Sequence, residues 1–185
     1  MKSKLIILVM IITLLSACSN TNQRDEILLN KYESAYEKLA SHDNFEILSD
    51  YYQIELVVSE VESGSHRIDL ILDEPQVAMY NIEMMMEVNP TGSQQYDEVL
   101  SSLGIVDDLT YNLIPNQVNA DNGFYEGLVL SSVSDQVKGE VKVLITWTNY
   151  SSTQNFEEFI VLSYDNDLKD PQATEDNSEV DDNDE

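Results

Sequence analysis

The pattern of apolar and polar residues divides the chain into four stretches. Residues 5–12 read LIILVMII and contain no polar side chain. From residue 23 to 44 the apolar residues recur every three or four positions, and from 45 to 164 they tend to alternate with polar ones. Residues 165–185 show no apolar period. These periods predict one helix followed by a β-rich domain and a polar tail.

The first period belongs to the sequence QRDEILLNKYESAYEKLA, in which Leu28, Tyr32, Tyr36 and Leu39 follow one another at spacings of four and three. This spacing places them on one face of a helix. We expect an amphipathic helix at 23–44 that packs on the domain after a short tether. A coiled-coil partner helix is the alternative, but it would need more heptads.

The alternating region breaks into short runs separated by Gly, Pro, Asn and Ser. Strands are predicted at 52–58, 68–72, 77–88, 109–114, 124–133, 141–149 and 156–164. Residues 94–103 instead suit a short helix that ends at Gly104. Because no strand–helix–strand alternation of adequate length occurs, the sequence disfavours a parallel α/β fold, and we expect an antiparallel sandwich or barrel.

The run at 77–88 carries the strongest alternation. Its predicted inward residues are Ala78, Tyr80, Ile82, Met84, Met86 and Val88. Met85 then points the other way, so we expect a central strand that is covered on both faces. An adaptable methionine-rich binding patch is the alternative.

The sequence VLITWTN at 143–149, followed by a serine-rich turn and the strand at 156–164, resembles immunoglobulin-like modules of bacterial surface lipoproteins. The resemblance implies an immunoglobulin-like sandwich with Trp147 in the core between its sheets. The cysteine pair of antibody domains is absent.

The N-terminus has the layout of a secretory signal, with Lys2 and Lys4 before the apolar run. That run is too short for the ~20 residues of a membrane-spanning helix. The motif Leu15-Ser16-Ala17-Cys18 resembles the lipobox of bacterial lipoproteins. It implies a signal peptide at 1–17, cleavage between Ala17 and Cys18, and a diacylglycerol thioether on Cys18. The expected product has a lipid anchor and a tether at 18–22, on the outer side of the cell membrane or in the outer membrane.

The charge and cysteine content limit the kinds of molecule that this chain could bind. The chain has 35 Asp and Glu against 9 Lys and Arg, a net charge of −26. This charge excludes a nucleic-acid partner and electrostatic adhesion to anionic lipid, and it favours a cationic protein or ligand. The single cysteine excludes an intramolecular disulfide and a cysteine-based zinc site. The acidic residues 165–185 are expected to be disordered.

Candidate chemistry is sparse. The two histidines, His42 and His66, are expected at the surface, and neither lies in a nucleophile motif. Adjacent carboxylates occur at 73–74, 97–98, 107–108 and 157–158, but neighbours on a strand face opposite ways. The run at 165–170 lacks the glycine and closing glutamate of a calcium loop.

We therefore predict no catalytic residue, no metal and no cofactor. The leading functional hypothesis is an anchored, non-catalytic envelope protein that binds a protein or another envelope ligand. The alternatives are a carboxylate-dependent hydrolase and, less favoured by size, the solute-binding component of a transporter.

Overall fold

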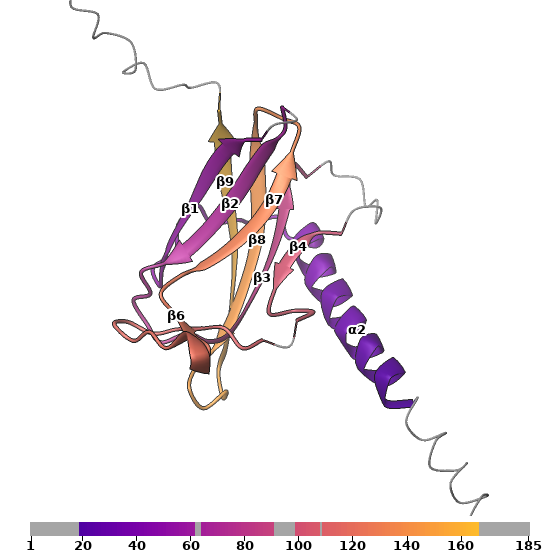
Figure 1. Cartoon of the computed structure of the whole chain (residues 1–185), viewed down its shortest axis with the longest axis vertical. Helices are drawn as coiled ribbons and strands as arrows, with labels where there is room; N and C mark the ends of the chain where they lie inside the picture. Colours follow the sequence, from indigo (N-terminus) through magenta and orange to yellow (C-terminus); the bar gives the residue numbers. More distant parts are fainter. Residues whose placement is uncertain (1–18, 62–63, 91–98, 108, 167–185) are drawn as a thin grey trace, which may run out of the picture.

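The computed structural model describes residues 19–61, 64–90, 99–107 and 109–166, with side chains from residue 23 onward. Two sheets face each other (Figure 1). The front sheet has the order β1-β2-β7, formed by Gln53–Glu60, His66–Asp73 and Leu128–Ser134. The back sheet has the order β4-β3-β8-β9, formed by Ser101–Leu103, Tyr80–Val88, Lys138–Thr148 and Asn155–Asp165.

Every strand pair within the front and back sheets is antiparallel. A short parallel pair, β5 (Asn112–Leu113) with β6 (Phe124–Tyr125), and the 3-10 helix η1 (Ala120–Asn122) lie at one end. The described strands form open sheets, so the prediction of a mainly antiparallel β fold is confirmed in the form of a sandwich rather than a barrel.

The main core lies between the sheets. Ile68, Leu70 and Leu72 of β2 meet Met84 and Met86 of β3. Trp147 of β8 is buried in the same cluster, as predicted. Met85 is buried too, on the opposite face of the back sheet. The prediction of a central strand covered on both faces is therefore confirmed.

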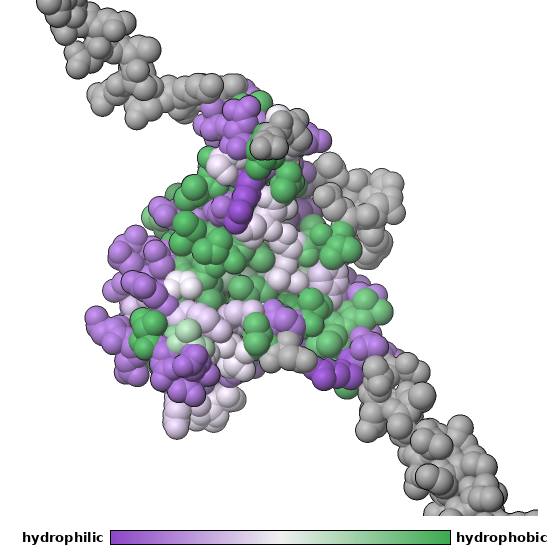
Figure 2. Space-filling view, in the orientation of Figure 1, coloured by the Kyte–Doolittle hydropathy of each residue, from purple (hydrophilic) through white to green (hydrophobic). Residues whose placement is uncertain are grey.

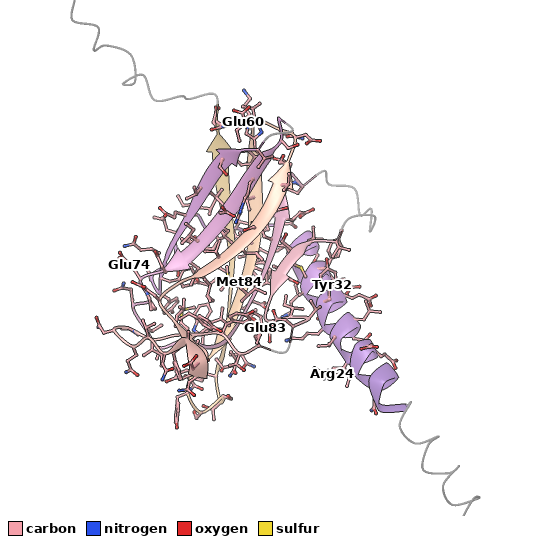
Figure 3. The ribbon with its side chains drawn as sticks, in the orientation of Figure 1. Arg24, Tyr32, Glu60, Glu74, Glu83 and Met84 are labelled. Carbon is pink, nitrogen blue, oxygen red and sulfur yellow. The ribbon has the colours of Figure 1, made fainter. Side chains whose placement is uncertain are left out.

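Helix α2 (Ser19–Ser41) covers the outer face of the back sheet. Tyr36 and Leu39 pack against Met85 of β3 and Leu144 of β8 in a second cluster. The helix begins earlier than the pattern predicts, so residues 19–22, assigned to the tether, are helical. Its N-terminal half projects away from the sandwich, and Figure 3 shows Arg24 on this half and Tyr32 beside the sheet.

Three local predictions were wrong. Residues 101–103 form strand β4 rather than helix, because they pair with β3, where Leu103 lies opposite Met84. The expected strand at 109–114 is reduced to β5, and the expected strand at 124–133 is divided into β6 and β7.

The inward set of β3 was also partly wrong. Met79 is buried instead of Ala78, because the register shifts between Tyr80 and Glu83. Asn81 adopts a positive φ of 52° within this irregularity, a conformation that asparagine tolerates better than most residues. The backbone of Met79 then bonds Leu113 of β5 instead of continuing the sheet.

The signal peptide, Cys18, and residues 167–185 of the acidic tail lie outside the described residues; Asp165 ends β9. Within the described part of the chain, no helix is long and apolar enough to cross a membrane.

Candidate functional site

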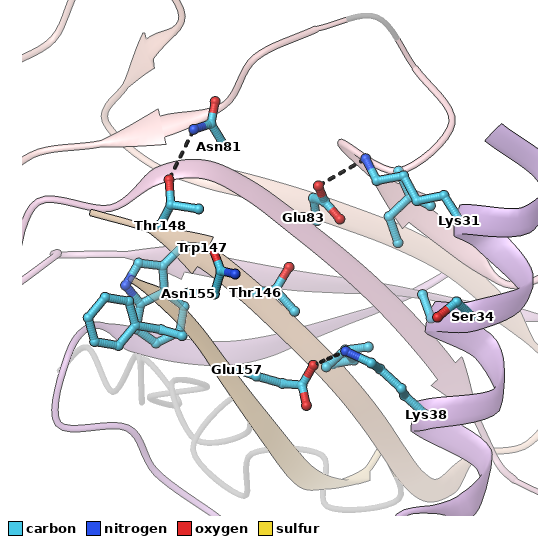
Figure 4. A pocket seen from close by; sticks show the side chains of 14 residues that line it. Lys31, Ser34, Lys38, Asn81, Glu83, Thr146, Trp147, Thr148, Asn155 and Glu157 are labelled. Carbon is cyan, nitrogen blue, oxygen red and sulfur yellow. Dashed lines mark hydrogen bonds and ion pairs between the residues drawn. The ribbon is translucent and has the colours of Figure 1, made fainter. Parts of the chain in front are cut away.

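A groove opens where α2 diverges from the back sheet (Figure 4). Its volume is about 570 Å³, within the usual range for ligand sites. The lining side chains are Lys31, Ser34, Ala35, Lys38, Asn81, Glu83, Ile105, Leu144, Thr146, Trp147, Thr148, Asn155, Phe156 and Glu157. Leu144 and Ile105 are buried in the cluster under α2, and Figure 4 shows Lys31 and Lys38 of the helix opposite Glu83 and Glu157 of the sheet.

One row of the groove carries four charges in two ion pairs. Glu83 of β3, Thr146 of β8 and Glu157 of β9 are register partners, so they share the outer face of the sheet. Lys31 lies 2.9 Å from the Glu83 carboxylate, and Lys38 pairs with Glu157. The two lysines are seven residues apart, which places them on one face of α2 about 10 Å apart along its axis.

Lys31 makes a second contact besides its ion pair with Glu83. Its ammonium donates to the carbonyl of Gly104 at 2.8 Å. Gly104 has a φ of 74°, and a Cβ there would collide with the carbonyl oxygen of Ile82. The glycine therefore allows the chain after β4 to approach β3 closely, where its carbonyl meets the helix lysine.

The second row is uncharged. The Asn81 amide donates to Thr148 Oγ1 at 3.0 Å, and Asn155 lies opposite Thr148 on β9. Asn81 also donates its backbone N–H to Asn112 Oδ1 at 3.0 Å, which links β5 to this edge of the groove. On the inner side of the same strands, the rings of Trp147 and Phe156 stack at 5.2 Å with an interplanar angle of 7° and pack in the core between the sheets. The row therefore offers amide and hydroxyl groups to the groove.

Each carboxylate of the charged row has a lysine of α2 as its partner, Lys31 for Glu83 and Lys38 for Glu157. Their charges are therefore matched within the groove.

The predicted carboxylate pairs do not assemble a second site. Glu157 faces the groove, whereas Glu158 turns inward and accepts a hydrogen bond from Ser49 at 2.8 Å, so the expectation of opposite faces is confirmed. Asp107 accepts the backbone N–H groups of Gly104 and Leu109. The pair at 73–74 lies at the end of β2, and 97–98 and 108 lie outside the described residues.

The two histidines differ in burial. His42 follows α2, is half-buried and stacks on Phe159 with a centroid distance of 3.6 Å, whereas His66 is buried at the start of β2. The prediction of a surface position is therefore wrong for His66. Among the described residues, none is a hydrogen-bond partner of His66 Nδ1. Neither residue lines the groove.

Two other carboxylates have shifted pKa values. Burial raises the pKa of Glu87, on the outer face of the back sheet, and Lys142 offsets this only in part. On the outer face of the front sheet, burial alone would raise the pKa of Asp69, but hydrogen bonds from Ser131 and Arg67 lower it below its usual value.

Sequence reasoning missed the groove. The helical pattern concerns the apolar face alone and gives no reason to join Lys31 and Lys38 to Glu83 and Glu157. The signal available was their spacing of two helical turns. Across the described ranges, no group of three or more His, Cys, Asp or Glu side chains is placed to hold a metal ion. Cys18, the predicted lipidation site, and most of the run at 165–170 fall outside those ranges.

Comparison with known proteins identifies no family for this chain. No family of known proteins matches the sequence, and no curated protein matches it. A solved structure titled "X-ray structure of Northeast Structural Genomics Consortium target SoR45" is similar at 15% sequence identity, covering 71% of this chain and 99% of that chain, with a TM-score of 0.35.

Proposed function

We propose that this chain is a lipid-anchored, non-catalytic protein of the bacterial envelope, and that it binds a short zwitterionic peptide segment in the groove between α2 and the back sheet. The observation that supports the binding role is that two ion pairs, Lys31–Glu83 and Lys38–Glu157, stand at the two ends of one row, beside a second row of amide and hydroxyl groups. Their spacing of about 10 Å is the length of three extended residues. A free ammonium and carboxylate at the ends of such a ligand would meet a carboxylate and a lysine.

The anchor rests on the lipobox resemblance at Leu15–Cys18. Two or three acyl chains on Cys18 would hold the protein stably, because each buried CH₂ contributes about 0.8 kcal/mol. The immunoglobulin-like character of the sandwich and a disordered acidic tail belong to the same proposal. The two antiparallel sheets with Trp147 between them support the first of these.

The binding test uses the full chain and trialanine as the probe. We expect trialanine to bind, and N-acetyl-trialanine amide, which lacks both terminal charges, to bind at least about tenfold more weakly. Ser34→Trp fills the groove and should abolish binding. Ala40→Trp is the matched control, because Ala40 is also exposed on α2 but does not line the groove.

Titration calorimetry and amide shifts of β8 and β9 residues give the readout. Equal binding by the two tryptophan variants would exclude the groove. The anchor is tested separately, since Cys18→Ala should move the protein out of the membrane fraction. An unchanged membrane fraction would exclude lipidation.

A further inference from the structure

The outer face of the front sheet carries exposed valines beside the charged pair Arg67–Asp69, and no helix or strand of the described residues covers it. Val57, Val129 and Val133 remain 43%, 51% and 59% exposed. The β1-β2-β7 register sets Val129 beside Ile71 and places Val57 one row away, beside Asp69. Figure 2 views this face directly and shows hydrophobic patches among neutral and hydrophilic groups over these strands. An exposed apolar area with a polar border is typical of an interaction site.

One part of this face is hollowed. A depression of about 440 Å³ lies where the segment around β6 rises beside β2 and β7. Its apolar lining includes Ile71 and Val129 on the sheet and Val118 and Tyr125 on that segment. Gly127 lets the two parts meet, because a Cβ there would lie only 3.1 Å from the Asp73 side chain. The hollow can accept one apolar side chain of a partner.

The border of the face is negative. Asp73 and Glu126 line the hollow, and Glu55 lies beside Ile71 in the register. Among the described residues, none of these three carboxylates has an ion-pair partner. The face has one cation, Arg67, and its guanidinium already donates to Asp69 at 2.8 Å and to Ser131. A partner with lysine or arginine beside its apolar residues would match this border.

We infer that this face docks a short cationic amphipathic segment of another protein, with one apolar side chain in the hollow. The surface is separate from the groove under α2 and does not depend on the ligand proposed there. Three neighbouring strands span two strand spacings, which is about 10 Å, and the four residue steps from Val129 to Val133 span about 13 Å along β7. The patch therefore measures about 10 by 13 Å. That matches the width of one helix and about two of its turns.

A second copy of the chain fits this face less well. A stable dimer usually buries about 800 Å² on each partner, far more than the roughly 130 Å² of this patch. Each copy also carries a net charge of −26, so two copies repel. The same charge opposes docking to an anionic membrane.

The test uses the full chain and two synthetic 14-residue peptides. Both have leucines three and four positions apart; the other positions are lysine in one peptide and glutamate in the second. We expect the lysine peptide to bind at least about tenfold more tightly in low salt, and this advantage to shrink as salt screens the charges.

Val129→Arg should weaken binding of the lysine peptide at least about tenfold. Val106→Arg is the matched control, because Val106 is 47% exposed and follows Ile105, which packs under α2. It should change the affinity less than about twofold. Ser34→Trp should leave the affinity unchanged, which separates this surface from the groove. The double variant Glu55→Gln/Asp73→Asn should weaken binding without altering the apolar contacts.

Circular dichroism checks that each variant is folded. Equal loss of affinity in Val129→Arg and Val106→Arg would overturn the proposal, as would equal affinity for the two peptides. A concentration-dependent dimer in analytical ultracentrifugation that Val129→Arg disperses would also overturn it, because the occupant would then be a second copy.

Discussion

The two sheets of the sandwich present very different outer faces. On the back sheet, α2 reduces the exposure of Met85 and Leu144 to 0% and 3%. On the front sheet, Val57 and Val129 stay about half exposed at equivalent positions of the pleat. On both outer faces a few apolar residues stand among charged and polar ones, so strand sequence alone does not distinguish them. The difference comes from α2, a separate segment that covers one face and leaves the other available to a partner.

The largest expected effect comes from weakening the covered face. Leu39→Ala removes a fully buried side chain from the α2 cluster, and we expect the free energy of unfolding to fall by about 2–4 kcal/mol. Val129→Ala on the uncovered face should change it by less than about 0.5 kcal/mol. Urea denaturation of both variants measures the contrast. Similar losses would mean that the two faces are equally important to stability.

A second change disturbs the same face through the backbone. Gly104→Ala introduces a Cβ at a positive φ and against the carbonyl oxygen of Ile82. We expect a loss of about 1–3 kcal/mol, together with a weaker Lys31 contact. Gly64→Ala is the control, because Gly64 also has a positive φ but, apart from its chain neighbours, no atom of the described residues lies within 4 Å of the added Cβ. The difference between the two melting temperatures isolates the steric contribution.

A smaller effect is expected from the ion pairs that join α2 to the sheet. Lys38→Met removes the partner of Glu157, and both side chains are partly exposed. The expected loss is about 0.2–1 kcal/mol in low salt, and it should diminish in 1 M NaCl. A loss that is independent of salt would show that the stem of Lys38, rather than its charge, stabilises the helix contact.

The smallest expected effects are on the pH dependence of stability. They have opposite signs for Asp69 on the front sheet and Glu87 on the back sheet. The folded-state pKa of Asp69 is lowered, so its stabilising contribution is present above the unfolded pKa and is lost as the pH falls through the folded one. Asp69→Asn should lower stability at pH 7 and converge with wild type in strong acid. Urea denaturation of wild type and Asp69→Asn at a series of pH values would measure this. A difference in the free energy of unfolding that stays constant across pH would contradict the prediction.

The pKa of Glu87 shifts in the opposite direction from that of Asp69. Its folded-state pKa is raised, so its ionisation disfavours folding at neutral pH, and this cost vanishes as the pH falls below the unfolded pKa. Glu87→Gln should raise the melting temperature at pH 7 and leave it unchanged near pH 3. The reverse pattern would mean that Lys142 dominates over burial at this position.

Regular periodicity predicted most of the fold. Ile68, Leu70 and Leu72 occupy every second position, and this alternation identified β2. The strand pairs with β1 and β7 along its length, so its regular geometry matches the pattern. Prediction failed where contacts distant in sequence decide the outcome. Residues 101–103 form a strand because β3 offers them a free edge, and Met79 replaces Ala78 because β5 captures its backbone.

The groove was harder to predict for the same reason. Lys31 is 52 positions from Glu83, and Lys38 is 119 from Glu157, so no local pattern joins them. The uncovered face was equally hidden, since a polar border and exposed valines are defined only after the strands are aligned. Both candidate surfaces therefore depend on the order of strands and on the position of α2.

The early start of α2 has a mechanical consequence. The helix begins at residue 19, and its projecting part to Asn30 spans about 18 Å at 1.5 Å per residue. With Cys18 acylated as we propose, a flexible linker of that length would let the domain touch the membrane surface, whereas a helix there would hold the domain at a distance and restrict its orientations.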